Sequence, residues 1–327
     1  MSRQELFLNE YATGGLKKWK AHEGFILDSV NGYDVLECQL CKFAHVVPIP
    51  DESELQRVYH DEYYGEEKPN YLEEHSEDLD WWNVVHGERY ERIEQLLGQQ
   101  SGRLCDIGSG PGSFLLSGKS RGWDTLGIEP SSQAAAQSRA HGANVVEEFL
   151  TPELAHSLGR FDAIQMSEVL EHHPDPQKFL KIARMMMDPQ GVLCVVVPND
   201  YNPLQRAVQQ LTQCESWWVA PPHHLNYFTL QSLCHLLAQC GFSVVDSHTT
   251  FPMEFFLLMG EHYIGNDKLG RNCHKKRMQF ELNLSQTGLQ KEKATIFRNF
   301  AALGIGRELV VYAKPNVQSP EQEEENL

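Results

Sequence analysis

The chain has 327 residues, of which 41% are hydrophobic and 22% charged, and its mean hydropathy is −0.44. It is long enough to bury a large core, and no run approaches the roughly 20 apolar residues of a membrane-spanning helix. The 45 acidic and 28 basic residues give a net charge of −17, which disfavours a surface that binds nucleic-acid backbones. With scattered cysteines and no signal-peptide pattern, we expect reduced thiols and a cytoplasmic protein.

The N-terminal segment contains one C-x-x-C pair, Cys38 and Cys41. Because a structural zinc ion needs four ligands and a second pair is absent, the pair is weak evidence for a metal. His22, His45 or His60 could complete a site, although a histidine in a polar segment is more often simply exposed. The alternative, which we favour, is a metal-free module held together by its apolar residues.

A polar linker then leads into a segment from Trp81 to Leu97 whose apolar residues recur at helical spacing. We therefore expect an amphipathic helix at residues 71–98, before the first strand of the next domain.

The most informative stretch is LCDIGSGPGSF, residues 104–114, which places Asp106 and closely spaced glycines directly after a short apolar run. Glycines in a strand-to-helix turn let the main chain approach a ligand closely. About twenty residues later, Glu129 ends the next predicted strand, where doubly wound folds place the acceptor for two ribose hydroxyls. The pair predicts a cofactor that contains a nucleoside.

The details of the loop favour one cofactor over another. The glycines read G-x-G-x-G, whereas a pyrophosphate loop has G-x-G-x-x-G. A carboxylate at Asp106 would repel a pyrophosphate and attract a ligand that carries an ammonium and a sulfonium. S-adenosylmethionine (SAM) therefore fits better than NAD or FAD.

Two later segments, FDAIQMSEVLEHHPDP at 161–176 and GVLCVVVPN at 191–199, read as the fourth and fifth strands with their following turns. Together with DIGSGPG and GIEPS, they make residues 100–250 resemble the class I (Rossmann-like) SAM-dependent methyltransferases. That resemblance implies an α/β fold with a doubly wound, mostly parallel sheet of seven strands. The core would span residues 99–250, and the last strand would lie at 306–314.

The resemblance also implies a set of residues that hold SAM. They are Asp106, Gly108 and Gly110 at the methionine end, Glu129 at the ribose, Glu148 and Phe149 beside the adenine, and Met166 and Ser167 at the sulfonium. The position of Glu148 stays open, because Glu147 and Glu148 could equally be the solvated start of a helix.

Residues 31–64 are similar to the zinc-knuckle module attached to sugar methyltransferases, whose members carry two C-x-x-C pairs. This resemblance implies a knuckle-like module at residues 1–70 that has lost one pair. It also implies that the helix at 71–98, with Tyr63 and Tyr64 ahead of it, folds over the cofactor. Ordinary packing against the sheet is the alternative.

The segment at 215–229 carries the paired histidines His223 and His224, and Thr229 is a predicted N-cap of the next helix. The loop would therefore lie beside the carboxyl ends of strands four and five, where open α/β sheets bind ligands. We predict that one histidine is the base that deprotonates an acceptor hydroxyl. The pocket walls would be Tyr63, Tyr64, Trp217, Trp218 and Tyr227. Alternatively, H-H-L-x-Y-F-T is a packing element of this methyltransferase group.

Roughly fifty residues at 251–305 exceed an ordinary turn and predict a helical cap that helps to select the substrate. Lys275, Lys276 and Arg277 could meet a phosphate there, although a solvated basic turn is the preferred alternative. We expect the acidic tail at 315–327 to be disordered.

The predicted function is direct methyl transfer from SAM to a small-molecule acceptor, without a metal in the reaction. By resemblance, O-methylation of a sugar, sugar nucleotide or secondary metabolite comes first, because the chain is too short for the further domain of sugar C-methyltransferases. The alternatives are C-methylation of a keto sugar and a non-catalytic SAM-binding module. A nucleotide-sugar oxidoreductase is disfavoured, since no Tyr-x-x-x-Lys pair is found near the loop.

Overall fold

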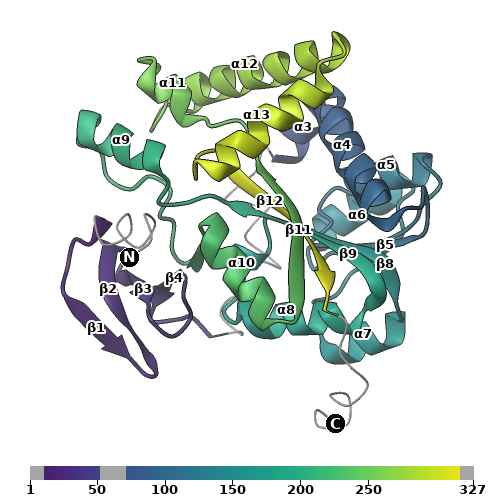
Figure 1. Cartoon of the computed structure of the whole chain (residues 1–327), viewed down its shortest axis with the longest axis horizontal. Helices are drawn as coiled ribbons and strands as arrows, with labels where there is room; N and C mark the ends of the chain where they lie inside the picture. Colours follow the sequence, from purple (N-terminus) through teal and green to yellow (C-terminus); the bar gives the residue numbers. More distant parts are fainter. Residues whose placement is uncertain (1–10, 52–70, 317–327) are drawn as a thin grey trace.

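The computed structural model describes residues 11–51 and 71–316, and these form two sheets and their covering helices (Figure 1). The larger sheet has seven strands in the order β11-β12-β9-β8-β5-β6-β7. It confirms the predicted α/β fold with a doubly wound, mostly parallel sheet. The expectations for His60, Tyr63, Tyr64 and the acidic tail after residue 316 lie outside the described residues.

Six strands of this sheet run in the same direction: β11 (Phe242–Thr249) and the five adjacent strands β5 (Arg103–Ile107), β6 (Asp124–Ile128), β7 (Val145–Val146), β8 (Phe161–Ser167) and β9 (Met187–Pro198). The antiparallel strand β12 (Glu308–Pro315) separates β9 from β11 (Phe242–Thr249). The second half of β9, Val192 to Val197, is continuously apolar and buried, as expected for a central strand that helices cover on both faces. Because β5 pairs with β6 on one side and β8 on the other, their carboxyl ends meet at one edge.

Helices pack on both faces of the sheet. One apolar cluster joins one face of the sheet to α7 (Pro152–Leu158), α8 (Pro176–Met185) and α10 (Leu230–Gln239). Another cluster joins the opposite face to α4 (Leu79–Leu97) and α5 (Ser113–Ser120). The short helices α6 (Ser132–Ala140), α9 (Pro203–Thr212) and η2 (Leu170–His172) follow strands β6, β9 and β8.

The predicted start of α10 is confirmed by its cap. The Thr229 hydroxyl oxygen accepts a hydrogen bond from the Ser232 backbone N–H at 3.2 Å, and the Ser232 hydroxyl in turn accepts one from the Thr229 N–H. This reciprocal pair satisfies backbone donors that a helix start leaves free. It fixes where the loop before α10 ends.

The N-terminal sheet consists of β1 (Leu16–Trp19), β2 (His22–Val30), β3 (Tyr33–Cys38) and β4 (Ala44–Val47), and it lies beside the core (Figure 1). Its fifth strand, β10 (Asn226–Tyr227), comes from the loop that carries His223 and His224. A small apolar core that includes Leu27, Val35, Tyr201 and Trp218 fills the space beneath this sheet. The N-terminal module and the core domain therefore share one sheet.

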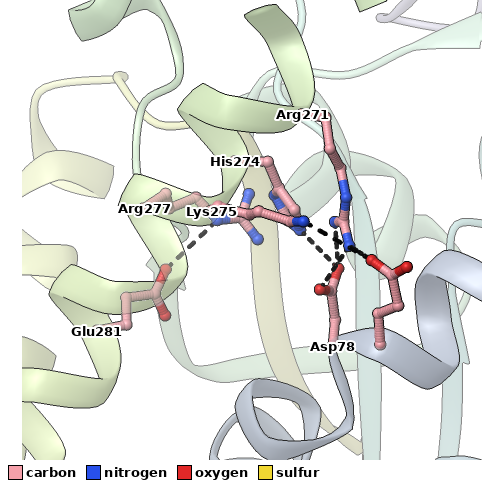
Figure 2. A network of polar contacts seen from close by, with 7 residues as sticks. Asp78, Arg271, His274, Lys275, Arg277 and Glu281 are labelled. Atoms are coloured by element: carbon pink, nitrogen blue, oxygen red, sulfur yellow. Dashed lines mark hydrogen bonds and ion pairs between the residues drawn. The ribbon is translucent and has the colours of Figure 1, made fainter. Parts of the chain in front are cut away.

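Residues 251–305 are largely helical, with α11 (Glu254–Leu258), α12 (Asp267–Gln286) and α13 (Gln290–Ala302). Helix α12 lies against the junction of α3 (Tyr71–Glu77) and α4, where Arg271 forms two hydrogen bonds to Asp78, at 2.5 and 2.8 Å (Figure 2). His274 adds a contact of 3.3 Å to the same carboxylate.

The basic run predicted to meet a phosphate, or to form a solvated turn, instead belongs to helix α12. Arg277 is buried, lies 3.5 Å from Glu281 and places its guanidinium 4.5 Å from the centre of the Trp81 ring. Lys276 pairs with Glu261. Lys275 lies 3.8 Å from a Glu77 carboxylate oxygen, so each of these charges has an acidic neighbour within the chain.

Candidate functional site

A cavity of about 250 Å³ opens at the carboxyl ends of β5, β6 and β8, on the side covered by α4. Its position is the ligand edge of a doubly wound sheet. The lining residues come from α3, α4, the loops after four strands, and the start of α8. They include His75, Trp82, His86, Arg89, Asp106, Gly108, Gly110, Glu129, Glu148, Phe149, Ser167, Glu168, His172, His173 and Glu308.

The loop after β5 approaches the cavity with bare main chain, and two of its glycines cannot be replaced without strain. Gly108 has φ +73°, and a Cβ there would lie 2.4 Å from a Val169 methyl carbon. Gly112 has φ +80° at the start of α5, and a Cβ there would lie 2.0 Å from the Ser138 hydroxyl oxygen. Both the left-handed backbone and the lack of space therefore require glycine.

Glu129 is held rigidly at the end of β6. One carboxylate oxygen accepts a hydrogen bond from the Gly110 N–H at 2.8 Å, and the other accepts one from the Ser131 N–H at 2.8 Å. Burial raises the pKa of this carboxyl group, while the two backbone donors oppose the rise. Each oxygen keeps a lone pair for a further donor.

Asp106 lies next to it, on β5, and is 3% exposed. Burial raises the pKa of its carboxyl group to about 7, against a hydrogen bond of 3.2 Å from the Gln165 amide and the positive charge of Arg89. The carboxylate form would therefore gain strongly from a cation bound in the cavity.

The charges on the cavity wall are mostly negative. Five carboxyl groups line it, from Asp106, Glu129, Glu148, Glu168 and Glu308. Among the described lining residues, Arg89 is the one lysine or arginine. Its guanidinium lies 3.5 Å from the Ser167 hydroxyl. Such a wall suits a ligand with a positive charge and one carboxylate better than a pyrophosphate.

Helices α3 and α4 form an aromatic side of the cavity. The Trp82 ring stacks between His75 and His86, at centroid distances of 5.2 and 5.3 Å. Burial lowers the pKa of His75 to about 4 and also holds that of His86 well below its usual value, so both rings are neutral near pH 7. The helical segment predicted at 71–98 thus forms a wall of the cavity.

A cluster of histidines lies at the edge of the cavity, on η2 and the loop before β10. The Nδ1 atom of His172 is 2.7 Å from the carbonyl oxygen of His223, and its Nε2 atom is 3.7 Å from a Glu171 carboxylate oxygen. The His224 ring packs edge-on against His172 at 4.9 Å. The Asn226 side-chain amide donates a hydrogen bond of 2.7 Å to the His173 carbonyl, which joins the two segments.

Seven of the eight residues predicted to hold SAM line this one cavity: Asp106, Gly108, Gly110, Glu129, Glu148, Phe149 and Ser167. Met166, the eighth, lies on β8 with its side chain in the core and is not among the lining residues. The cavity therefore lies among the residues that the sequence predicted to be near the cofactor.

The predicted acceptor-side residues lie elsewhere. His223 and His224 are absent from the cavity wall and support His172 from behind, the first through its carbonyl group. Trp217, Trp218 and Tyr227 pack in or against the core of the N-terminal sheet, because β10 carries their loop into that sheet.

Sequence reasoning missed the lining residues Arg89, His75, Trp82, His172 and His173. The histidines had a usable signal, since E-H-H follows the fourth strand directly and this strand ends at the ligand edge. Glu168 offers a second sign, because its φ of +54° is rare for a residue with a side chain and marks a constrained turn at the cavity.

Comparison with known proteins identifies the family of the chain. A family described as a methyltransferase domain matches residues 85–247. A ubiquinone biosynthesis O-methyltransferase from Azorhizobium caulinodans is 34% identical over 171 residues, which cover 50% of this chain and 67% of that protein. The chain belongs to the class I SAM-dependent methyltransferases.

More distant similarities also occur. The C-methyltransferase NovU from Streptomyces niveus is 25% identical over 152 residues, covering 45% of this chain and 34% of that protein. A crystal structure of a SAM-dependent methyltransferase from Archaeoglobus fulgidus has a TM-score of 0.45 at 17% identity, covering 70% of this chain and 94% of that one. The chain spans about half the length of the first curated relatives it matches. In the described ranges, no helix has the length and apolar character of a membrane span.

Proposed function

We propose that the protein transfers a methyl group from SAM to a hydroxyl group of a small-molecule acceptor such as a sugar, a sugar nucleotide or a secondary metabolite. The observation that carries the proposal is the joint presence, in one cavity, of a SAM-compatible set of charges and a histidine backed by a carboxylate. The relatives add support, since the similar protein from Azorhizobium caulinodans is an O-methyltransferase of ubiquinone biosynthesis.

The residues of the cavity fit SAM. Asp106 would face the methionyl ammonium, Arg89 the methionyl carboxylate, and Glu129 the ribose hydroxyls. Glu148 and Phe149 would border the adenine, and Ser167 the sulfonium end. Two buried lining atoms, the Gln165 amide oxygen and the Ser109 hydroxyl, have no hydrogen-bond partner among the described residues, so a ligand could satisfy them.

Bound SAM would supply an electrophilic methyl group on its sulfonium. The chain itself would align the acceptor, exclude water and remove a proton. His172 is the residue we assign to that last role, because its Nδ1–H donates to the His223 carbonyl and so leaves Nε2 as a proton acceptor. Glu171, 3.7 Å from Nε2, would stabilise the imidazolium that forms, and His224 would hold the ring in place.

C-methylation of a keto sugar is the second candidate, and the similarity to NovU favours it. The same histidine would then remove a proton from carbon rather than from oxygen. A third possibility, a SAM-binding module without catalysis, would keep the cavity but show no turnover.

Calorimetric titration with SAM and, separately, with NAD tests the cofactor. We expect saturable SAM binding that is lost in Asp106→Ala and Glu129→Ala and kept in Glu153→Ala, which removes an exposed acid on α7. Binding of NAD without SAM would refute the proposal.

Transfer of a ¹³C-methyl group from SAM to panels of hydroxylated and keto sugars tests the reaction. The chemical shift of the new methyl group separates O-methyl from C-methyl products. SAM binding without transfer to any member of panels that also include phenols would favour the non-catalytic module.

A further inference from the structure

Four potential metal ligands meet in the N-terminal sheet, away from the cofactor cavity. His22 begins β2, Cys38 ends β3, Cys41 lies in the turn that follows, and His45 is on β4. One ligand atom of each lies within 4.8 Å of the others. The antiparallel pairing of β3 with β2 and with β4 brings these residues together, because Cys38 pairs with Gly24 and Leu36 pairs with His45.

The distances match those of a tetrahedral metal site. The Nδ1 atom of His22 lies 3.6 Å from the Cys38 sulfur and 3.4 Å from the Cys41 sulfur. With Zn–S bonds of about 2.3 Å and Zn–N bonds of about 2.0–2.1 Å, adjacent corners of a tetrahedron are about 3.5–3.6 Å apart. His22 thus already stands at this spacing from both sulfurs, and His45 lies within 4.8 Å of the other three ligand atoms.

The surroundings also prepare the ligands. The Nδ1 atom of His45 lies 2.9 Å from the Val46 carbonyl oxygen, while its Nε2 atom is buried and has no hydrogen-bond partner within the described part of the chain. Metal-binding histidines commonly donate the second ring N–H to such a carbonyl. The Cys41 backbone N–H points at the Cys38 sulfur at 3.5 Å, which stabilises a thiolate there.

We propose that His22, Cys38, Cys41 and His45 bind one Zn²⁺ ion. Two sulfur and two nitrogen ligands at tetrahedral spacing select zinc over the harder cations. Four protein ligands leave no open position, so the ion is structural rather than catalytic. The sequence lacks a second cysteine pair and so favours a metal-free module, but His22 on β2 and His45 on β4, the strands on either side of β3, take the place of that pair.

The zinc site also bears on the cofactor cavity, and this part of the inference rests on the proposed function. His45 pairs with Asn226 on β10, and the Asn226 amide holds the His173 carbonyl at the cavity edge. Phe43, between the ligands Cys41 and His45, packs against Phe228 at 5.2 Å. The ion would therefore fix the strand that supports the loop of His223 and His224.

Metal analysis of the full chain, purified without a histidine tag, tests the site. We expect about one zinc per chain by mass spectrometry of the metal. After exchange with Co²⁺, we expect the visible absorption of a tetrahedral site and a sulfur-to-cobalt charge-transfer band. Cys41→Ser and His45→Ala should lower the zinc content at least ten-fold, whereas Cys234→Ser and His156→Ala should keep it.

The wild-type readouts stand even if a variant does not fold. Zinc-free wild-type protein that also fails to give the charge-transfer band with Co²⁺ would overturn the proposal, and so would full zinc content in folded Cys41→Ser and His45→Ala. Release of zinc when a mercurial reagent titrates the wild-type thiols would support it. Because none of these measurements uses SAM, failure of the proposed function would leave the metal result intact.

A last measurement tests the coupling. Removing zinc from the wild-type protein should lower methyl transfer at least ten-fold while the SAM dissociation constant changes less than three-fold, since Asp106 and Glu129 lie on other strands. Equal losses of methyl-transfer rate and SAM affinity would contradict the link from β4 to the histidine loop.

Discussion

Protonation of Asp106 should control SAM affinity between pH 6 and pH 7. The carboxyl group lines the cavity, and burial raises its pKa to about 7 in the free protein. A bound ammonium and sulfonium would hold it ionised, so binding at lower pH must first release its proton. A pocket whose acids are all fully ionised above pH 6 would bind SAM with no such pH dependence.

The size of the effect follows from the pKa. A group with a pKa of about 7 is half ionised at pH 7 and about 9% ionised at pH 6, so the SAM dissociation constant should rise about five-fold, or about 1 kcal/mol. The sign for folding follows from the same shift. Because the pKa in the folded protein exceeds the ordinary 3.8, the ligand-free protein should lose stability as the pH rises from about 4 to about 7, and SAM should restore it.

Calorimetry at pH 6, 6.5 and 7 in buffers of different ionisation enthalpy measures both affinity and proton release. This range also keeps the amino group of SAM charged, since α-amino groups titrate near pH 8. We expect about half a proton released at pH 7 and nearly one at pH 6. A flat profile in the wild type, or the same slope in Asp106→Asn, would refute the reasoning.

Three further outcomes are expected. Gly108→Ala should lower the folding stability by about 1–2 kcal/mol or more and abolish SAM binding, because its Cβ would lie 2.4 Å from a Val169 methyl carbon. Adding Val169→Ala to the same chain should restore part of the stability measured by urea unfolding, and no recovery would contradict the steric cause. Asp78→Ala should lower the free energy of unfolding by about 1.5–3 kcal/mol, because it removes the acidic partner of Arg271 that holds α12 against α4. The Glu77 side chain is 54% exposed, so Glu77→Ala should lower it by less than about 1 kcal/mol; equal losses in the two variants would argue against Asp78 as the anchor. His172→Ala should lower kcat about 10²–10⁴-fold and leave the SAM dissociation constant within three-fold, and an unchanged kcat would remove the histidine from the mechanism.

The cofactor side of the site could be predicted because its chemistry is local in sequence. Asp106, Gly108 and Gly110 lie within five residues, and Glu129 follows at the next strand end. In a βαβ unit, neighbouring strands bring such residues to one edge by topology alone. The structure places all four on the cavity wall.

The acceptor side could not be predicted in this way, because it depends on a pairing between distant segments. Trp218 and Tyr227 read as pocket walls until β10 is known to join the N-terminal sheet, where they become core residues. The role of Arg277 is similarly ambiguous from the sequence: Glu281 lies four residues further along the same helix, but only the packing of α12 on α4 brings Trp81 against the guanidinium. Patterns along the chain indicate the chemical role that a side chain can take, but not which distant segment of the chain it will contact.

The pairing of β4 with β10 also has a consequence for how the chain folds. The first four strands leave the ribosome early, yet the strand that completes their sheet is made only after most of the core domain. Until then, the edge of β4 offers unpaired backbone groups to any passing strand. Closing such a distant contact is slow, since loop entropy must be lost before the contact forms. A nascent chain stalled before residue 226 should therefore be the form most prone to aggregation and most dependent on chaperones.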